Sequence, residues 1–246
     1  MPVLISFLAL TTLGQIKTSQ PLPTKKPFAE SLQAVVVITE APESPQGKAR
    51  LFERKSVKTG WKKVSDEFPV VVGRNGLGWS ADSAPEGISD FKKEGDGRSP
   101  AGLMLLTFAF GRPDRPNGVK LSYVKLEEYS ECVDDMSSSH YNRLVDRLKV
   151  GMFDWKTSEK MLEVGQEYDL GIFVAHNSYP VRPGNGSCIF LHIWKDPMTG
   201  TSGCTAMARE NLQRILAWAD PAKHTFLVQL TKADRDKYRK AWNLPK

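Results

Sequence analysis

Short apolar runs, separated by glycine and proline turn signals, are the feature that most constrains the fold of this sequence. The chain of 246 residues has 19 glycines and 16 prolines spread between these runs, which favours many short strands over a helical bundle. The first three runs predict successive antiparallel strands, and the near-continuous apolar runs at 168–175 and 187–194 are typical of central strands buried on both faces. The predicted strands cover residues 33–39, 49–57, 68–72, 103–110, 168–175, 187–194 and 225–230.

Three other segments predict helices. The clearest is an amphipathic helix that ends at Asp220-Pro221, where one buried stripe is formed by Ala208, Leu212, Ile215, Leu216 and Ala219. Residues 139–150 carry a second stripe, and the charged residues 232–246 predict a C-terminal helix. The fold class is therefore expected to be mainly β with short helices.

The N-terminal segment has the character of an export signal. Residues 3–10 (VLISFLAL) are too few to span a bilayer but match the length of a signal-peptide core. We therefore expect an export segment at 1–22, a Pro-rich linker at 23–32 and the main domain at 33–231, with no membrane span left after signal removal. A monomer is expected.

The charge of the chain is only modestly basic, at +6 with a pI near 9.1. An excess of this kind suits an anionic partner. However, the sequence has neither a basic platform interleaved with aromatic residues nor a known nucleic-acid module, which argues against nucleic-acid binding.

Three cysteines, Cys132, Cys188 and Cys204, lack the spacing of a zinc finger, and we expect no metal and no other cofactor. An odd count leaves at least one thiol free. If the protein is exported, a disulfide between Cys132 and Cys188 would close a loop of 56 residues and stabilise the fold by about 4 kcal/mol in the chain-entropy model. That pairing would leave Cys204 free.

The segment from His192 to Cys204 contains the candidates for a catalytic site. A histidine in an apolar strand is by itself more often a core residue, but the loop after it places Cys204 at or just before the predicted helix at 208–219. A helix N-terminus would lower the pKa of the thiol, and the N–H groups of Gly203 and Cys204 would bind a developing oxyanion. Cysteine-dependent acyl transfer, with Cys204 as nucleophile and His192 as base, is weighed against a merely buried thiol.

Several polar or aromatic residues near these two are candidates for lining a substrate site. They come from the loop before the cysteine and from the ends of the two central strands: Thr201, Ser202, Trp194, His176 and Asn177.

The segments 188–192 (CIFLH) and 201–206 (TSGCTA) resemble the L,D-transpeptidase (YkuD) domain, whose signature is a strand histidine followed by Ser/Thr-His-Gly-Cys. The Gly/Pro-rich loop 94–102 (EGDGRSPAG) is similar to the segment that precedes a central strand in that family. The resemblance implies a mixed β-sandwich, Cys204 as nucleophile, His192 as base and a backbone carbonyl as third element. It also implies a bacterial envelope or periplasmic enzyme that acts on peptidoglycan stem peptides, expels D-alanine and passes the acyl group to an amine.

The sequence departs from that signature at three points and so resembles a divergent branch of the family. Ser202 stands in place of the histidine, Ala206 in place of the usual Asn or Arg, and only 12 residues separate His192 from Cys204. The departures bear on the acyl acceptor. Two alternatives to transpeptidation therefore stay open: an L,D-carboxypeptidase or amidase that uses water, and a cell-wall binding module without activity.

Overall fold

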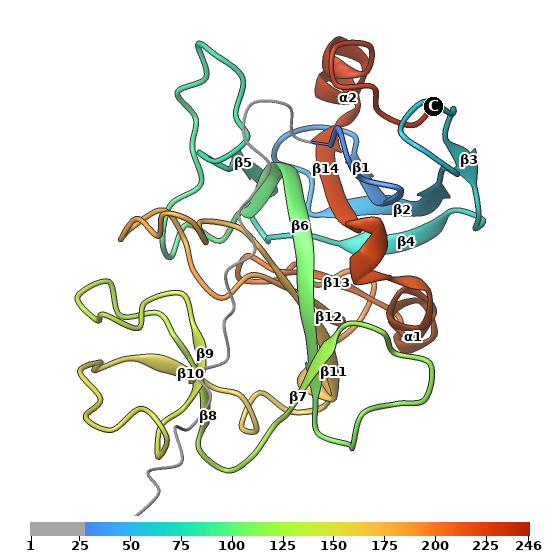
Figure 1. Ribbon diagram of the computed structural model, residues 1–246. Coiled ribbons are helices and arrows are strands. Elements are labelled where there is room, and N and C mark those ends of the chain that lie inside the picture. The colour runs from blue at the N-terminus through green and yellow to red at the C-terminus, as the bar shows by residue number, and fades with distance from the viewer. Residues whose placement is uncertain (1–27) are drawn as a thin grey trace, which may run out of the picture.

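The frame of the molecule is a β-sheet that closes on itself (Figure 1). The structure is a computed structural model that describes residues 28–246. The strands of the sheet are β1 (Gln33–Thr39), β2 (Gln46–Glu53), β3 (Lys62–Lys63), β4 (Phe68–Val71), β5 (Leu77–Trp79), β6 (Ser99–Gly111), β7 (Ser122–Lys125), β11 (Leu170–Val174), β12 (Phe190–Ile193), β13 (Thr205–Met207) and β14 (Phe226–Thr231). They follow the order β1-β14-β6-β11-β12-β13-β4-β2-β3, with β5 and β7 paired to β6.

The pairing of β1 with both β14 and β2 closes this sheet into a barrel-like ring. Most pairs are antiparallel, but β1–β14, β12–β13, β5–β6 and β6–β7 are parallel, so the sheet is mixed. The prediction of a mainly β fold with short helices is confirmed. The predicted export segment 1–22, and linker residues 23–27, lie outside the described residues.

Three short strands form a second sheet, at the lower left of Figure 1. They are β8 (Ser130–Val133), β9 (Leu144–Asp146) and β10 (Ser158–Lys160), in the order β10-β8-β9. A disulfide joins Cys132 on β8 to Cys188, two residues before β12. The bond ties the small sheet to the centre of the large one.

The two α-helices lie outside the ring of strands (Figure 1). Helix α1 (Arg209–Trp218) buries Leu212, Ile215 and Leu216 and packs near β11 and β12. It ends just before Pro221, as its spacing predicted, and the 3-10 helix η2 (Pro221–Lys223) follows. Helix α2 (Lys232–Tyr238) is shorter than the expected 232–246. No helix within residues 28–246 is long and apolar enough to cross a membrane.

The central strands carry the site. Strand β11 lies between β6 and β12, and all residues of β11 and β12 are buried, as the apolar runs predicted. Strand β6 begins at Ser99, so residues 99–102, which we expected in a loop, already belong to the sheet.

The prediction of a helix at residues 139–150 is wrong. The segment forms turns and then β9, because Asn142 has a positive φ of 63° that ends any helix there. Its side chain is fixed by long-range hydrogen bonds: the amide nitrogen donates to the carbonyls of His176 (2.9 Å) and Asn177 (2.7 Å), and the amide oxygen accepts from Cys188 N–H (2.9 Å). These tertiary contacts override the local apolar spacing.

Candidate active site

A cavity of about 560 Å³ opens over β12 and β13. It brings together both residues of the proposed catalytic pair and several of the polar residues expected beside them. Its lining includes Cys204, His192, Gly203, Ser202, Thr201, Trp194, Ala206, Lys92, Glu94, Asp134, Glu159, Glu167 and Tyr168.

Cys204 does not begin a helix, which corrects the expectation from sequence. It directly precedes β13, whose residues pair with β12 on one side and β4 on the other, and α1 begins only at Arg209. The three-residue strand β13 (Thr205–Met207) separates Cys204 from the helix, and its backbone pairs with these neighbouring strands. The thiol therefore receives no stabilisation from a helix N-terminus.

The register of the sheet places Cys204 and His192 on the same face. His192 pairs with Ala206 in the parallel ladder, and Cys204 lies two residues before Ala206, so both side chains project to one side. Cys204 is the free cysteine and is 7% exposed. Its Sγ accepts a hydrogen bond from Phe190 N–H at 3.3 Å, and the thiol donates to the Cys188 carbonyl at 3.4 Å.

Burial controls the ionisation of this thiol at rest. Desolvation, and next the charge of Glu159, raise the pKa of Cys204 well above its ordinary value, while Phe190 N–H, the Tyr168 hydroxyl and Lys92 act in the opposite direction. The sulfur is thus protonated at neutral pH until a base removes its proton.

His192, which lines the same cavity, is the candidate for that base. Its Nδ1–H donates to the Ile193 carbonyl at 2.8 Å, which leaves Nε2 unprotonated and able to accept a proton. Burial lowers the pKa of His192 to about 4, so the ring is neutral at pH 7. A backbone carbonyl holding the imidazole is the third element that the resemblance implied. Within residues 28–246 no direct hydrogen bond joins His192 to Cys204.

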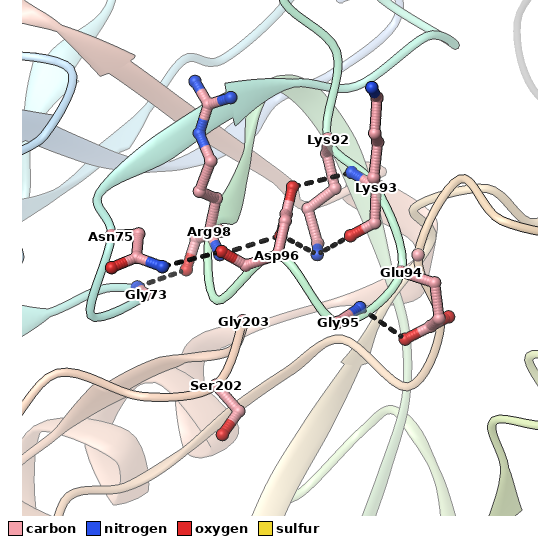
Figure 2. A network of polar contacts seen from close by, with 12 residues as sticks. Gly73, Asn75, Lys92, Lys93, Glu94, Gly95, Asp96, Arg98, Ser202 and Gly203 are labelled. Carbon is pink, nitrogen blue, oxygen red and sulfur yellow. Dashed lines mark hydrogen bonds and ion pairs between the residues drawn. The ribbon is translucent and has the colours of Figure 1, made fainter.

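The Gly/Pro-rich segment is built around a buried ion pair, drawn in Figure 2. Lys92 Nζ lies 2.8 Å from Asp96 Oδ1, and the side chain of Lys92 is only 3% exposed. Asp96 also accepts hydrogen bonds from the backbone N–H groups of Lys93 (2.7 Å) and Arg98 (2.9 Å). Asp96 therefore fixes the loop that carries Lys92 into the cavity wall.

The end of the same segment holds the cysteine backbone. Ser99 Oγ donates to the Cys204 carbonyl at 2.7 Å and accepts from Gly73 N–H at 2.8 Å. Thr201 Oγ1 donates to the same carbonyl at 2.6 Å. The sequence motif, about a hundred residues away along the chain, thus positions the nucleophile candidate.

Gly203 has no positive φ, and a side chain at this position would be only moderately crowded. A Cβ at this position would lie 3.3 Å from Ile189 Cδ1 and 3.4 Å from the Arg98 carbonyl oxygen, and Figure 2 shows the residue facing the Gly/Pro-rich loop. Ser202 Oγ accepts a hydrogen bond from Arg74 Nη1 at 3.1 Å. Trp194 also lines the cavity.

His176 and Asn177 lie outside the cavity lining, contrary to the expectation that they contact substrate. His176 is 1% exposed, with Nε2–H donating to the Asn185 carbonyl (2.7 Å) and Nδ1 accepting from Ser80 Oγ (2.9 Å). Asn177 Nδ2 donates to the carbonyls of Arg182 and Gly186. Both residues hold the loop between β11 and β12.

Sequence reasoning missed Tyr168 and Glu159. Tyr168 ends the 3-10 helix η1 (Gln166–Tyr168), and its ring centroid lies 5.2 Å from that of His192. Its hydroxyl donates to Glu159 Oε2 at 2.6 Å and lies close enough to the Cys204 thiol to lower the pKa of that thiol. No local pattern marks either residue, because only the folded sheet brings them to Cys204.

The buried histidines predict a loss of stability in acid. Burial lowers the pKa of both His176 and His192 to about 4, so between pH 6.5 and 4 the unfolded chain binds protons that the native state does not. Stability present above pH 6.5 is therefore lost as the pH falls, by up to about 3 kcal/mol for each residue. Glu159, whose pKa burial raises to about 7, opposes this trend between pH 7 and 4.5.

Urea unfolding at a series of pH values measures the effect. We expect His176→Gln to reduce the slope of the unfolding free energy against pH in this window by about one proton, whatever it does to the absolute stability. His224, with a side chain 44% exposed, provides the control, and His224→Asn should keep the wild-type slope. Equal slopes in all three proteins would contradict the assignment of a buried neutral His176.

The fold is thus a barrel-like β domain in which a thiol and a neutral imidazole line one cavity. The model of the YkuD family, the L,D-transpeptidase catalytic domain, matches residues 49–229, and the chain belongs to this family. Members of the family are cysteine-dependent enzymes that act on peptidoglycan.

Among curated proteins, no sequence matches this chain. Among solved structures, the chain is similar to the helical cell shape determining protein Pgp2 from Campylobacter jejuni, with 15% sequence identity and a TM-score of 0.40. The similarity covers 82% of this chain and 50% of that structure, so the chain spans half of its length.

Within residues 28–246, no group of three or more His, Cys, Asp and Glu side chains is arranged to hold a metal ion.

Proposed function

We propose that this chain is an exported L,D-transpeptidase that forms an acyl-enzyme on Cys204 with peptidoglycan stem peptides. The observation that carries the proposal is the placement of Cys204 and His192 on one face of β12 and β13, at one cavity, with the imidazole neutral and its Nδ1–H held by Ile193. Membership of the YkuD family supports the substrate class.

The reaction begins with proton transfer from the Cys204 thiol to His192 Nε2. The sulfur then attacks the carbonyl at the L-centre of diaminopimelate in a tetrapeptide stem, and Nε2 returns the proton to the amine of the departing D-alanine. The Gly203 N–H already donates to Thr201 Oγ1 at 3.1 Å. We therefore assign oxyanion binding to the Cys204 N–H, for which no acceptor is found within residues 28–246.

The second half-reaction depends on the acceptor that reaches the thioester. An amine of another stem gives a 3-3 cross-link, whereas water gives a free tripeptide. His192 Nε2 removes the proton of either acceptor, and the thiol is regenerated.

Hydrolysis is the second candidate, and one observation favours it. Ala206 pairs directly with His192 and lines the cavity, so the Asn or Arg usual in the family would extend a side chain beside the imidazole. Alanine offers no polar group there to hold an amine acceptor beside the base. An L,D-carboxypeptidase or amidase is the enzyme that this arrangement would produce.

Product analysis separates the two candidates. Incubation with tetrapeptide muropeptides should release D-alanine, and mass spectrometry of the products should show a cross-linked dimer for transpeptidation or a bare tripeptide for carboxypeptidation. If D-alanine release does not exceed that of a Cys204→Ala control and no dimer forms, both enzymatic proposals fail and a peptidoglycan-binding role remains.

A further inference from the structure

Tyr168 occupies a position between the two catalytic candidates and a half-buried carboxyl group. Its ring packs against His192 and, at a centroid distance of 5.4 Å, against Phe190. Its hydroxyl contacts both Glu159 Oε2, at 2.6 Å, and the Cys204 thiol. The side chain is buried, with 5% exposed, so few other partners compete for that hydroxyl.

A phenol has one proton to donate, and here two acceptors are within reach. When Glu159 is ionised it only accepts, so the Tyr168 proton points to the carboxylate and the sulfur receives none. When Glu159 is protonated it donates to Tyr168 Oη, and the Tyr168 proton is free to bind a thiolate on Cys204. The protonation state of Glu159 therefore sets the direction of the whole chain of hydrogen bonds.

The surroundings of Glu159 make both states accessible near neutral pH. Burial raises its pKa to about 7, the carboxylates of Asp134 and Glu94 add to this rise, and the bond from Tyr168 opposes it. Other titratable groups near the Tyr168–Cys204 contact are the Lys92 ammonium, which favours the thiolate, and the His192 imidazole, which is neutral.

We propose that Glu159 is a positioning residue that acts through Tyr168, and that its protonated form turns the Tyr168 hydroxyl onto the Cys204 thiolate. The only bond exchanged is that of the thiol proton: the S–H bond of Cys204 breaks and an N–H bond forms on His192 Nε2, while the Glu159 and Tyr168 protons stay on their oxygens and change acceptor. The inference rests on the proposed function, because it takes Cys204 as the nucleophile. Where Glu159 is protonated, the hydrogen bond from Tyr168 stabilises the thiolate and makes Cys204 more reactive than burial alone allows.

The test is the rate of Cys204 alkylation by iodoacetamide between pH 5 and 9, followed by mass spectrometry of the folded protein. In Glu159→Gln the amide N–H donates to Tyr168 Oη at every pH, as the protonated acid does. We expect this variant to react about tenfold faster than wild type at pH 8.5, the effect of one unit in the thiol pKa, and the two rates to converge below pH 6. Superimposable profiles would overturn the proposal.

Two further variants separate the hydrogen bond from simple charge. Glu167→Gln removes the same charge from the same cavity without touching the Tyr168 hydroxyl, and it should keep the wild-type inflection near pH 7. In a Tyr168→Phe background the effect of Glu159→Gln should fall at least about threefold, because only the through-space charge term remains. An effect of equal size with and without the hydroxyl contradicts the role of Tyr168.

Alkylation needs no peptidoglycan, so this inference and the proposed function fail separately. A protein with the expected pH profile but no muropeptide product refutes the function alone. Muropeptide turnover with identical profiles for wild type and Glu159→Gln refutes the inference alone. If Tyr168→Phe does not fold, the comparison of Glu159→Gln with Glu167→Gln decides by itself.

Discussion

Replacing Cys204 by alanine is expected to abolish D-alanine release from tetrapeptide stems, with a loss of at least about a thousandfold in turnover. The thiol is the only free one in residues 28–246, since Cys132 and Cys188 are bonded to each other. No other sulfur in this part of the chain can therefore replace it as nucleophile. Turnover is measured by quantifying released D-alanine under substrate excess.

Two controls establish that the loss is chemical. The Cys204 side chain is small and lies against the cavity, so Cys204→Ala should unfold with nearly the wild-type midpoint in urea. Cys204→Ser keeps nearly the same side-chain size and replaces the thiol by a hydroxyl group. It should be almost as inactive, because a serine lacks the acidity and nucleophilicity of a thiol. Retention of more than a tenth of wild-type turnover in both variants would exclude the covalent mechanism.

Removing the Cys132–Cys188 disulfide is expected to cost about 4 kcal/mol of unfolding free energy. The two cysteines are 56 residues apart, and closing a loop of that length restricts the unfolded chain by about this amount in the chain-entropy model. Both residues are buried, and the bond links the small sheet to the strand that begins the site. Urea unfolding of the Cys204→Ala protein, with and without dithiothreitol, measures the difference without interference from the free thiol.

A double variant checks the origin of the effect. Cys132→Ala with Cys188→Ala should be destabilised by a similar amount and should no longer respond to dithiothreitol. An unchanged midpoint in the reduced protein would show that the disulfide contributes nothing to the stability of this fold.

Periodicity predicted the strands well because their burial is local and continuous. The runs at 33–39, 168–175 and 187–194 became β1, β11 and β12, and the stripe at 208–219 became α1. The prediction failed at 139–150, where Asn142 adopts a left-handed conformation to reach three backbone groups on other segments. The hydrogen bond from Cys188 N–H to Asn142 joins residues 46 positions apart, and no local sequence pattern predicts it.

The site was predicted in its residue types but not in its electrostatics. His192, Cys204, Trp194, Thr201 and Ser202 were expected at one site and do line one cavity. The helix N-terminus assigned to Cys204 is absent, because Thr205, Ala206 and Met207 pair with β12, and Ala206 and Met207 also pair with β4. The groups that act on the thiol, Tyr168, Glu159 and Lys92, come from three other segments, so only the folded chain reveals them.

The central claim is a thioester on Cys204, and intact-mass analysis of an acid-quenched reaction tests it most directly. After brief incubation with a tetrapeptide stem, the protein mass should increase by that of the tripeptide acyl group, and the adduct should map to the peptide that contains Cys204. Cys204→Ala should carry no adduct. Release of D-alanine by the wild type with no adduct trapped, and equal release by Cys204→Ala, would contradict the account.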